Sequence, residues 1–325
     1  MPFYKIGTIG DKADAYISKK LFEEYKQRYN YPKCGEVMIT CAGTVGKTIL
    51  YNGQDAYYQD SNIVWISNPR KIYSNEFLNY LLNRVDWSKL NSTTITRIYN
   101  DNLRELHITF PSREEQDKIV SLLTRIDDRI DTQSKIIEEQ ETLLRSLRHK
   151  IYSRVQAESQ CTIADVLCYE QPTKYLVTDT DYTDDDSQVP VLTANKAFIL
   201  GYTTENFGIY DKGPCIILDD FTLDCKYVDF KFKVKSSAIK ILRAKAKTNL
   251  RFIFEYFRFL ELNTTEHRRH YIAEIEPMSI LLPSNEEIDR IARLFTALDE
   301  RLEAARKELK ILESQKMYML QKMFI

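Results

Sequence analysis

The most regular pattern in the sequence is a series of apolar residues whose spacing alternates between four and three. It runs from residue 119 to residue 151, and most positions between its members are charged or polar. Such an alternation is the spacing of the a and d positions of a coiled-coil heptad, which form one stripe along a helix. The pattern therefore predicts a long helix that packs against another helix. Its apolar members include Ile119, Leu123, Ile126, Ile130, Ile137 and Leu144.

This helix has a second copy 172 residues later in the chain. Residues 111–115, Pro-Ser-Arg-Glu-Glu, become Pro-Ser-Asn-Glu-Glu at residues 283–287. In each copy the serine precedes a glutamate by three residues, which is the capping box that marks a helix start. We expect helices over residues 112–155 and 284–325, each of about 40 residues and so roughly 60 Å long. The second stripe includes Ile291, Phe295, Leu298, Leu302, Leu309 and Leu312.

Two long helices in one chain have each other as the obvious partner, and we expect them to form an antiparallel pair. Polar residues interrupt the apolar seam at Gln133, Gln140 and Lys316. These residues either fix the register of the pair at some cost in stability or lie in a frayed, solvent-facing stretch.

The segments before the two helices, residues 1–111 and 156–283, are predicted to be mixed α/β domains. Short β-rich runs occur at residues 36–40, 48–51 and 62–67, and again at 215–218, 227–234 and 238–242. A helical stretch follows each set. The expected fold class is α+β, with two mixed α/β domains separated by two long antiparallel coiled-coil helices in a pseudo-twofold internal repeat.

Composition places few further limits on the chain. It has 325 residues, 43% hydrophobic and 29% charged, and a net charge of −1, so any nucleic-acid-binding surface must be local. No run approaches the roughly 18 apolar residues of a membrane span, and no signal peptide is evident at the start. We therefore expect a cytoplasmic protein without a membrane partner. The six cysteines form no CxxC pair, and we expect them to be reduced.

One set of motifs resembles a known family. Gly35-Glu36-Val37-Met38-Ile39-Thr40 is followed by Gly43-Thr44-Val45-Gly46-Lys47, by Gln59-Asp60-Ser61-Asn62 and by Ile108-Thr109-Phe110-Pro111 before the long helix. This order resembles the specificity subunit of type I restriction-modification systems. The resemblance implies two target recognition domains, each of which reads one half of a split double-stranded DNA sequence, while the helices set the spacing.

The same resemblance implies that the chain has no catalytic activity and no cofactor of its own. It would dock two methyltransferase subunits, which bind S-adenosylmethionine, and restriction subunits, which use ATP and Mg²⁺.

The first domain departs from the second at its start. Residues 161–188 precede Val189-Pro190-Val191, whereas the matching Met1-Pro2-Phe3 opens the chain. From this comparison we expect the first domain to be shortened by an opening block of about two dozen residues, either because the chain starts late or because it is a shortened allele. We hypothesise that its sheet has an uncovered edge, which a partner or another copy of the chain covers.

Candidate DNA-contacting residues occur in both domains, because Lys and Arg bind phosphates, and Asn, Thr and Arg bind base edges. Lys231, Lys233 and Lys235 alternate and would share one strand face, either as a phosphate-facing stripe or as a solvated face. The full set is Lys19, Lys20, Thr44, Lys47, Thr94, Thr96, Arg97, Asn195, Lys196, Lys226, Tyr227, Lys231, Lys233, Lys235, His267, Arg268, Arg269 and His270.

Motifs of catalysis or metal binding are weak. Cys41 to Thr48 nearly matches a phosphate-binding loop, but the first glycine is Cys41 and a strand follows, so a tight turn between strands fits better. His267 and His270 have no carboxylate or cysteine at a convincing spacing, and we expect no metal site. No Asn-Pro-Pro-Tyr element of an adenine methyltransferase is present. We therefore expect no catalytic residues.

The alternative is a coiled-coil protein-interaction scaffold without sequence-specific DNA binding. Salt separates the two hypotheses, because DNA binding falls steeply as phosphate contacts are screened, whereas a protein-docking module shows no such slope.

Overall fold

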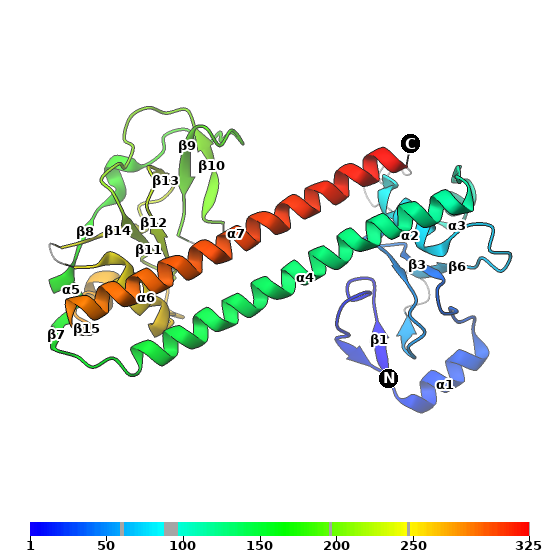
Figure 1. Cartoon of the computed structure of the whole chain (residues 1–325), viewed down its shortest axis with the longest axis horizontal. Helices are drawn as coiled ribbons and strands as arrows, with labels where there is room; N and C mark the ends of the chain where they lie inside the picture. Colours follow the sequence, from blue (N-terminus) through cyan, green and yellow to red (C-terminus); the bar gives the residue numbers. More distant parts are fainter. Residues whose placement is uncertain (59–61, 88–96, 195–196, 246–247, 325) are drawn as a thin grey trace. The chain divides into compact units, whose positions relative to one another are not determined.

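The computed structural model describes residues 1–58, 62–87, 97–194, 197–245 and 248–324 (Figure 1). It divides into two compact units, Met1–Ser134 with Lys307–Ile325, and Lys135–Arg306. Each contains a mixed α/β domain and parts of the two long helices, so the predicted combination of helix and sheet with two long helices is confirmed.

The first unit is built on two three-stranded sheets. One has the order β4-β3-β6 and is antiparallel, and the other has the order β2-β1-β5. The strands are β1 (Pro2–Tyr4), β2 (Ala15–Tyr16), β3 (Val37–Thr40), β4 (Thr48–Leu50), β5 (Tyr57–Tyr58) and β6 (Ile63–Ile66). The short helices are α1 (Lys19–Arg28), α2 (Asn75–Arg84) and α3 (Asn100–Arg104). The side chains of Val37, Ile39, Leu78 and Leu82 form a core between β3 and α2.

The second unit repeats this plan with more strands. Its sheets have the orders β12-β11-β14-β8, β10-β9-β13 and β15-β7. The strands are β7 (Ser159–Thr162), β8 (Leu167–Glu170), β9 (Val189–Leu192), β10 (Ile199–Thr203), β11 (Cys215–Asp219), β12 (Cys225–Val228), β13 (Lys233–Val234), β14 (Ile239–Ala244) and β15 (Ser279–Leu282). The helices are α5 (Ile163–Val166), η2 (Pro172–Tyr175), α6 (Leu250–Leu260) and the π-helical turn η3 (Tyr271–Ile275).

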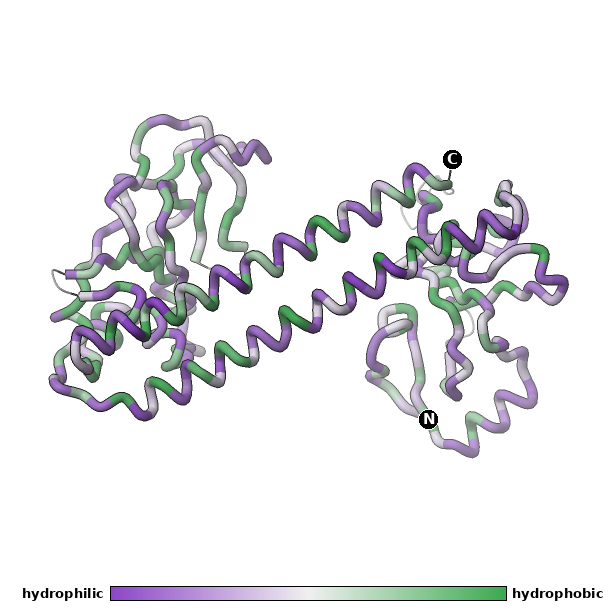
Figure 2. The backbone as a smooth tube through the Cα atoms, in the orientation of Figure 1, coloured by the Kyte–Doolittle hydropathy of each residue, from purple (hydrophilic) through white to green (hydrophobic). Residues whose placement is uncertain are grey.

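The long helices are α4 (Arg113–Tyr152) and α7 (Asn285–Met323), within one to three residues of the predicted ends. Each begins at the predicted serine, since the hydroxyl of Ser112 accepts from the Glu115 N–H and that of Ser284 from the Glu287 N–H, both at 3.3 Å. Figure 2 shows apolar residues recurring between polar ones along both helices.

Within each unit the two long helices lie antiparallel. In the first unit Lys316 pairs with Asp127 at 2.6 Å, and in the second Arg306 pairs with Glu141 at 2.6 Å, so early residues of α4 meet late residues of α7 and the reverse. Every predicted seam residue is buried or half-buried. Lys316 meets a carboxylate at its seam position, and the pair is consistent with a role in register.

No helix in the described ranges combines the length and apolar character needed to cross a membrane.

Candidate nucleic-acid interface

The predicted lysine stripe of the second unit is broken at its centre. The side chain of Lys233 is fully buried, and its ammonium pairs with Glu205 at 2.5 Å and donates to the backbone oxygen of Phe207 at 2.8 Å. The prediction that Lys233 faces phosphate is therefore wrong. The predicted strand 227–234 is in fact two strands, β12 and β13, and the turn between them destroys the alternation. Lys231 and Lys235 are exposed.

Groups other than Lys233 also stabilise the ionised carboxylate of Glu205. Its Oε1 accepts hydrogen bonds from the backbone N–H groups of Thr178 and Asp179, both at 2.9 Å. Burial by itself would raise the pKa of Glu205, but the hydrogen bonds from Lys233 and Thr178 outweigh it and lower the pKa to about 2. The Lys233–Glu205 pair therefore stabilises the fold of the loop region around β13.

In the loop after α6, one of the predicted DNA-contacting residues is buried. His270 is buried, its Nδ1 lies 3.0 Å from Glu274 and its Nε2 lies 3.1 Å from the Thr264 hydroxyl. A hydrogen bond with the backbone carbonyl of Glu266, followed by the hydrogen bond with Glu274 and the negative charge of that carboxylate, raises the pKa of His270 against the effect of burial. A DNA contact by His270 is thus contradicted, because its ring is used to shape the loop.

The sequence neighbours of His270 differ in whether their side chains already have partners within the protein. Arg268 is exposed but forms ion pairs with both Glu266 and Glu274. His267 stacks on Phe221 with ring centroids 5.1 Å apart. Arg269 is exposed and has no ion-pair partner among the described residues. It is therefore the guanidinium of this loop best placed to accept a phosphate or a base edge.

The base of the loop is fixed by a buried charge pair that sequence reasoning did not find. Asp220 and Lys240 lie 3.3 Å apart and are both almost fully buried. Asp220 also accepts the backbone N–H groups of His270 and Tyr271, at 3.1 and 2.8 Å. The Asp219-Asp220 pair is polar and suggests an exposed loop. Nothing in the local sequence indicates that the side chain of Asp220 is buried.

Two further candidates of the second unit lie on β12. Lys226 and Tyr227 are half-buried, and the Arg251 guanidinium sits 5.2 Å from the Tyr227 ring centre. Tyr227 also packs on Phe254. Tyr227 thus contributes to packing between β12 and α6. Asn195 and Lys196 lie outside the described residues.

In the first unit the glycine loop is a hairpin turn. β3 and β4 pair antiparallel on either side of it, and the Gly46 N–H donates to the Thr40 oxygen at 2.8 Å, which confirms the predicted tight turn. Lys47 pairs with Asp11 at 3.1 Å, while Thr44 is exposed.

The other candidates of the first unit lie in two places. Lys19 and Lys20 are exposed at the start of α1, with Lys19 3.9 Å from Glu23. Arg97 is half-buried beside the Tyr99 ring. Thr94 and Thr96 lie outside the described residues.

A charged cluster links α4, α6 and α7 inside the second unit. Arg148 pairs with Glu255 at 2.8 Å, and both side chains are buried. Arg251 pairs with Glu255 at 2.8 Å and with Asp299, and Arg258 lies 3.6 Å from Asp299. The cluster was not predicted. The one available signal was a charged Arg148 next to the apolar seam, where the equivalent position of the second copy holds Leu320.

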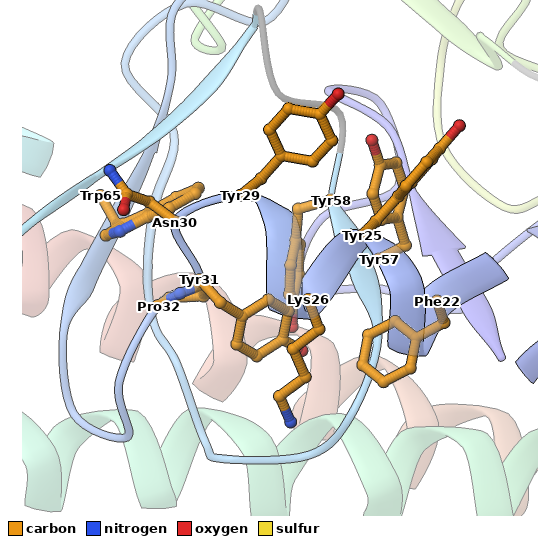
Figure 3. A pocket seen from close by; sticks show the side chains of 10 residues that line it. All are labelled: Phe22, Tyr25, Lys26, Tyr29, Asn30, Tyr31, Pro32, Tyr57, Tyr58 and Trp65. Carbon is orange, nitrogen blue, oxygen red and sulfur yellow. The ribbon is translucent and has the colours of Figure 1, made fainter. Parts of the chain in front are cut away.

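An aromatic pocket of about 200 Å³ lies in the first unit (Figure 3). Phe22, Tyr25 and Lys26 of α1 face it together with Tyr57 and Tyr58 of β5. Lys26 pairs with Asp55 at 2.6 Å, and the hydrogen bond that its ammonium donates to this carboxylate is the main reason that the pKa of Lys26 is raised. The pocket is therefore mainly a packing feature. Over the described residues no cluster of three or more potential metal ligands is found.

In architecture the chain is thus a two-unit protein in which two related α/β domains are each built against parts of the same two long helices. The family model for the Type I restriction modification DNA specificity domain matches residues 1–142.

Curated relatives carry the same description. A putative type I restriction enzyme specificity subunit of Haemophilus influenzae is 47% identical over 127 residues, which are 39% of this chain and 33% of that protein. A type I restriction enzyme specificity subunit of Escherichia coli is 42% identical over 158 residues, which are 44% of this chain and 39% of that protein. The match thus spans between a third and two fifths of these relatives. A putative specificity subunit of Methanocaldococcus jannaschii is 22% identical over 97% of this chain and 84% of its own length.

Solved structures show the same fold. The type I restriction-modification S subunit from M. genitalium aligns with a TM-score of 0.67 and 16% identity over 100% of this chain and 88% of its own. A chain from a structure that describes complex assembly and conformational transition of the type I R-M system aligns with a TM-score of 0.54 and 14% identity. The alignment covers 90% of this chain and 82% of that chain. The resemblance predicted from sequence is confirmed: residues 1–142 match the model of the type I DNA specificity domain, and the chain is similar to type I specificity subunits.

Proposed function

We propose that this chain is the DNA-recognition subunit of a type I restriction-modification complex and performs no chemistry itself. The observation that carries the proposal is the match of residues 1–142 to the type I DNA specificity domain. The strand order of the second unit adds support, because β10-β9-β13 and β12-β11-β14 repeat β2-β1-β5 and β4-β3-β6. One scaffold with two different sets of loops suits the reading of two different half-sites.

In this proposal each unit contacts one half of a split duplex sequence. Exposed cations and hydroxyls would make the contacts: Lys19, Lys20 and Thr44 in the first unit, and Lys231, Lys235 and Arg269 in the second. Phosphate contacts position the protein and base contacts select the sequence. The 40-residue helix α4 and the 39-residue helix α7 would set the distance between the half-sites.

The proposal includes the partners that complete the reaction. Two methyltransferase subunits would supply S-adenosylmethionine, and restriction subunits would use ATP and Mg²⁺. The relatives are named as specificity subunits of type I restriction enzymes, which supports a role within a larger complex.

The first test is to co-express the chain with a type I methyltransferase subunit from the same organism and to map modified adenines in a genomic library. We expect a split motif with a fixed gap. A palindromic motif would indicate that two copies of the second unit act together. Absence of methylation, together with duplex binding that does not weaken with salt, would refute DNA recognition and favour the protein-interaction scaffold.

A further inference from the structure

The second unit contains a cavity lined by cationic side chains. It has a volume of about 490 Å³ and lies between α4 and the end of α6. This volume falls within the roughly 300–1,000 Å³ of small-molecule sites. Its lining includes Arg145, Arg148 and His149 of α4 and Arg258 of α6. With His149 neutral, the three guanidiniums and one carboxylate, Glu261, of the described lining give a net charge of +2 (3 − 1).

Arg148 is the buried member of this lining, and its guanidinium is only partly used. Its Nε donates to Glu255 at 2.8 Å, while its buried Nη2 has no hydrogen-bond partner among the described residues. The Nε of Arg251 is buried and without a hydrogen-bond partner in the same sense. The three guanidiniums of Arg148, Arg251 and Arg258 share two carboxylates, Glu255 and Asp299. Buried donors without partners are costly, so an added anion would stabilise this cluster.

The other two arginines of the lining are weakly partnered. Arg258 lies 3.6 Å from Asp299 and 3.9 Å from Glu255, beyond hydrogen-bonding distance of both. Burial lowers the pKa of Arg258, and the positive charge of Arg148 lowers it further against the opposing effect of the two carboxylates. Arg145 is exposed and forms no ion pair with another described residue. These cations repel one another, and an anion between them would relieve the repulsion.

The internal repeat identifies the equivalent positions in the first unit. Phe252 of α6 contacts Tyr152 of α4 with ring centroids 5.2 Å apart, and Phe77 of α2 contacts Phe324 after α7 at 4.9 Å. This repeated contact relates α6 to α2 at an offset of 175 (252 − 77) and α4 to α7 at the offset of 172 (324 − 152).

The first unit carries none of these charges at the equivalent positions. Leu320, which corresponds to Arg148, is buried, so an apolar side chain can fill this place in the fold. Replacement of a buried ion pair by apolar residues is often neutral or stabilising, so packing alone does not require the charged cluster. A bound ligand would account for it. In order, Arg145, Arg148, His149 and Arg258 correspond to Met317, Leu320, Gln321 and Asn83.

The end of α6 gives a partial alternative explanation. Its last carbonyl groups carry the negative end of the helix dipole and attract cations within about one turn. Arg258 lies in this last turn. The dipole thus accounts for an exposed cation such as Arg145, but not for the buried, unpartnered Nη2 of Arg148.

We propose that this cavity binds an oxyanion of the phosphate class, held by the guanidiniums of Arg145, Arg148 and Arg258. Guanidinium groups suit this ligand because their planar N–H donors match the oxygens of a phosphate. Two sources carry the group: the backbone of a DNA duplex and a soluble phosphate. The inference does not depend on DNA recognition, because inorganic phosphate alone tests it.

Inorganic phosphate is the probe, titrated calorimetrically into the full chain at neutral pH and constant ionic strength in chloride. We expect saturable binding with an apparent Kd of about 1 mM or lower, and competition by sulfate. Trp65 and Trp87 both lie in the first unit, so their fluorescence should not follow the binding curve. Absence of saturable binding, or a tryptophan signal that follows it, would refute the site.

The first unit supplies the substitutions that remove the charges. Arg145→Met and Arg258→Asn follow its equivalent residues, and we expect each to weaken phosphate binding at least about fivefold. Arg293→Met is the matched control, because Arg293 is exposed on α7 in the same unit and forms no ion pair with a described residue; it should change binding less than about twofold. Equal effects of Arg145→Met and Arg293→Met would overturn the proposal. A loss of stability in Arg145→Met without weaker phosphate binding would assign Arg145 to the helix end and would also overturn it.

Duplex binding by the same variants, measured by fluorescence anisotropy over a range of salt, separates the two sources. A backbone phosphate in the cavity predicts that Arg145→Met binds duplexes of any sequence more weakly, with a salt slope reduced by about one. Unchanged duplex affinity together with weakened phosphate binding would identify a soluble phosphate. Either result supports the oxyanion site.

Discussion

Replacing Lys233 with methionine tests the internal position of this lysine most directly. The ammonium of Lys233 lies against Glu205, whose side chain is 10% exposed, and the substitution would leave this carboxylate without its counter-charge. Removal of one partner of a buried ion pair costs about 3–5 kcal/mol. Glu205 keeps the hydrogen bonds that it accepts from Thr178 and Asp179. We therefore expect a loss of stability at the lower end of this range, about 3 kcal/mol. In a unit of this size that corresponds to a fall in Tm of about 6–12 °C.

Differential scanning calorimetry would measure the effect, with tryptophan fluorescence as an internal control that follows only the first unit. Lys231→Met is the matched surface variant and should change stability by less than about 0.5 kcal/mol. The double variant Lys233→Met/Glu205→Gln should recover most of the loss, because no unpaired charge remains. If Lys233→Met were no more destabilising than Lys231→Met, the buried ion pair would be refuted.

The pH dependence gives a second, independent check. The folded-state pKa of Glu205 is lowered to about 2 from an ordinary value of 4.5, so its contribution to stability is full above pH 4.5 and is lost as pH falls toward 2. The stability difference between wild type and Lys233→Met should therefore shrink below pH 4.5. A difference that stays constant over this range would contradict the assignment of the stabilisation to the ionised pair.

Three further predictions concern DNA binding, spacing and the first hairpin. Arg269→Ala should weaken duplex binding more than Arg268→Ala, measured by fluorescence anisotropy, because Arg268 is already paired with two carboxylates; equal losses would contradict this. Deleting one heptad from both long helices should shorten the accepted spacer by about 10 Å, or about three base pairs, in the methylation assay, and an unchanged spacer would show that the helices do not set it. Gly46→Ala should destabilise the first unit by at least about 2 kcal/mol in urea unfolding, since its Cβ would lie 2.1 Å from Trp87. Gly35→Ala is the control, because it has the same φ of +84° and no atom within 4 Å, and should cost only about 1 kcal/mol; a similar cost for both would refute the clash.

The part of the site that sequence predicted well lies in local patterns. The turn at Gly43 to Gly46 and the serine caps at Ser112 and Ser284 follow from contacts within a few residues. The assignment of side chains to the DNA surface was less successful. The alternation of Lys231, Lys233 and Lys235 suggested one face, yet a break in the strand turned the middle lysine inward toward Glu205, 28 residues away.

The sequence by itself determined the two long helices, their repeat at 172 residues and the mixed domains before them, because heptad spacing, helix caps and strand periodicity are local properties. Only the tertiary structure decided which charges are internal, since the pairs of Lys233 with Glu205, Lys240 with Asp220 and Arg148 with Glu255 join residues far apart in the chain. This depends on which segments meet in space, because the burial of a charge is set by those distant neighbours.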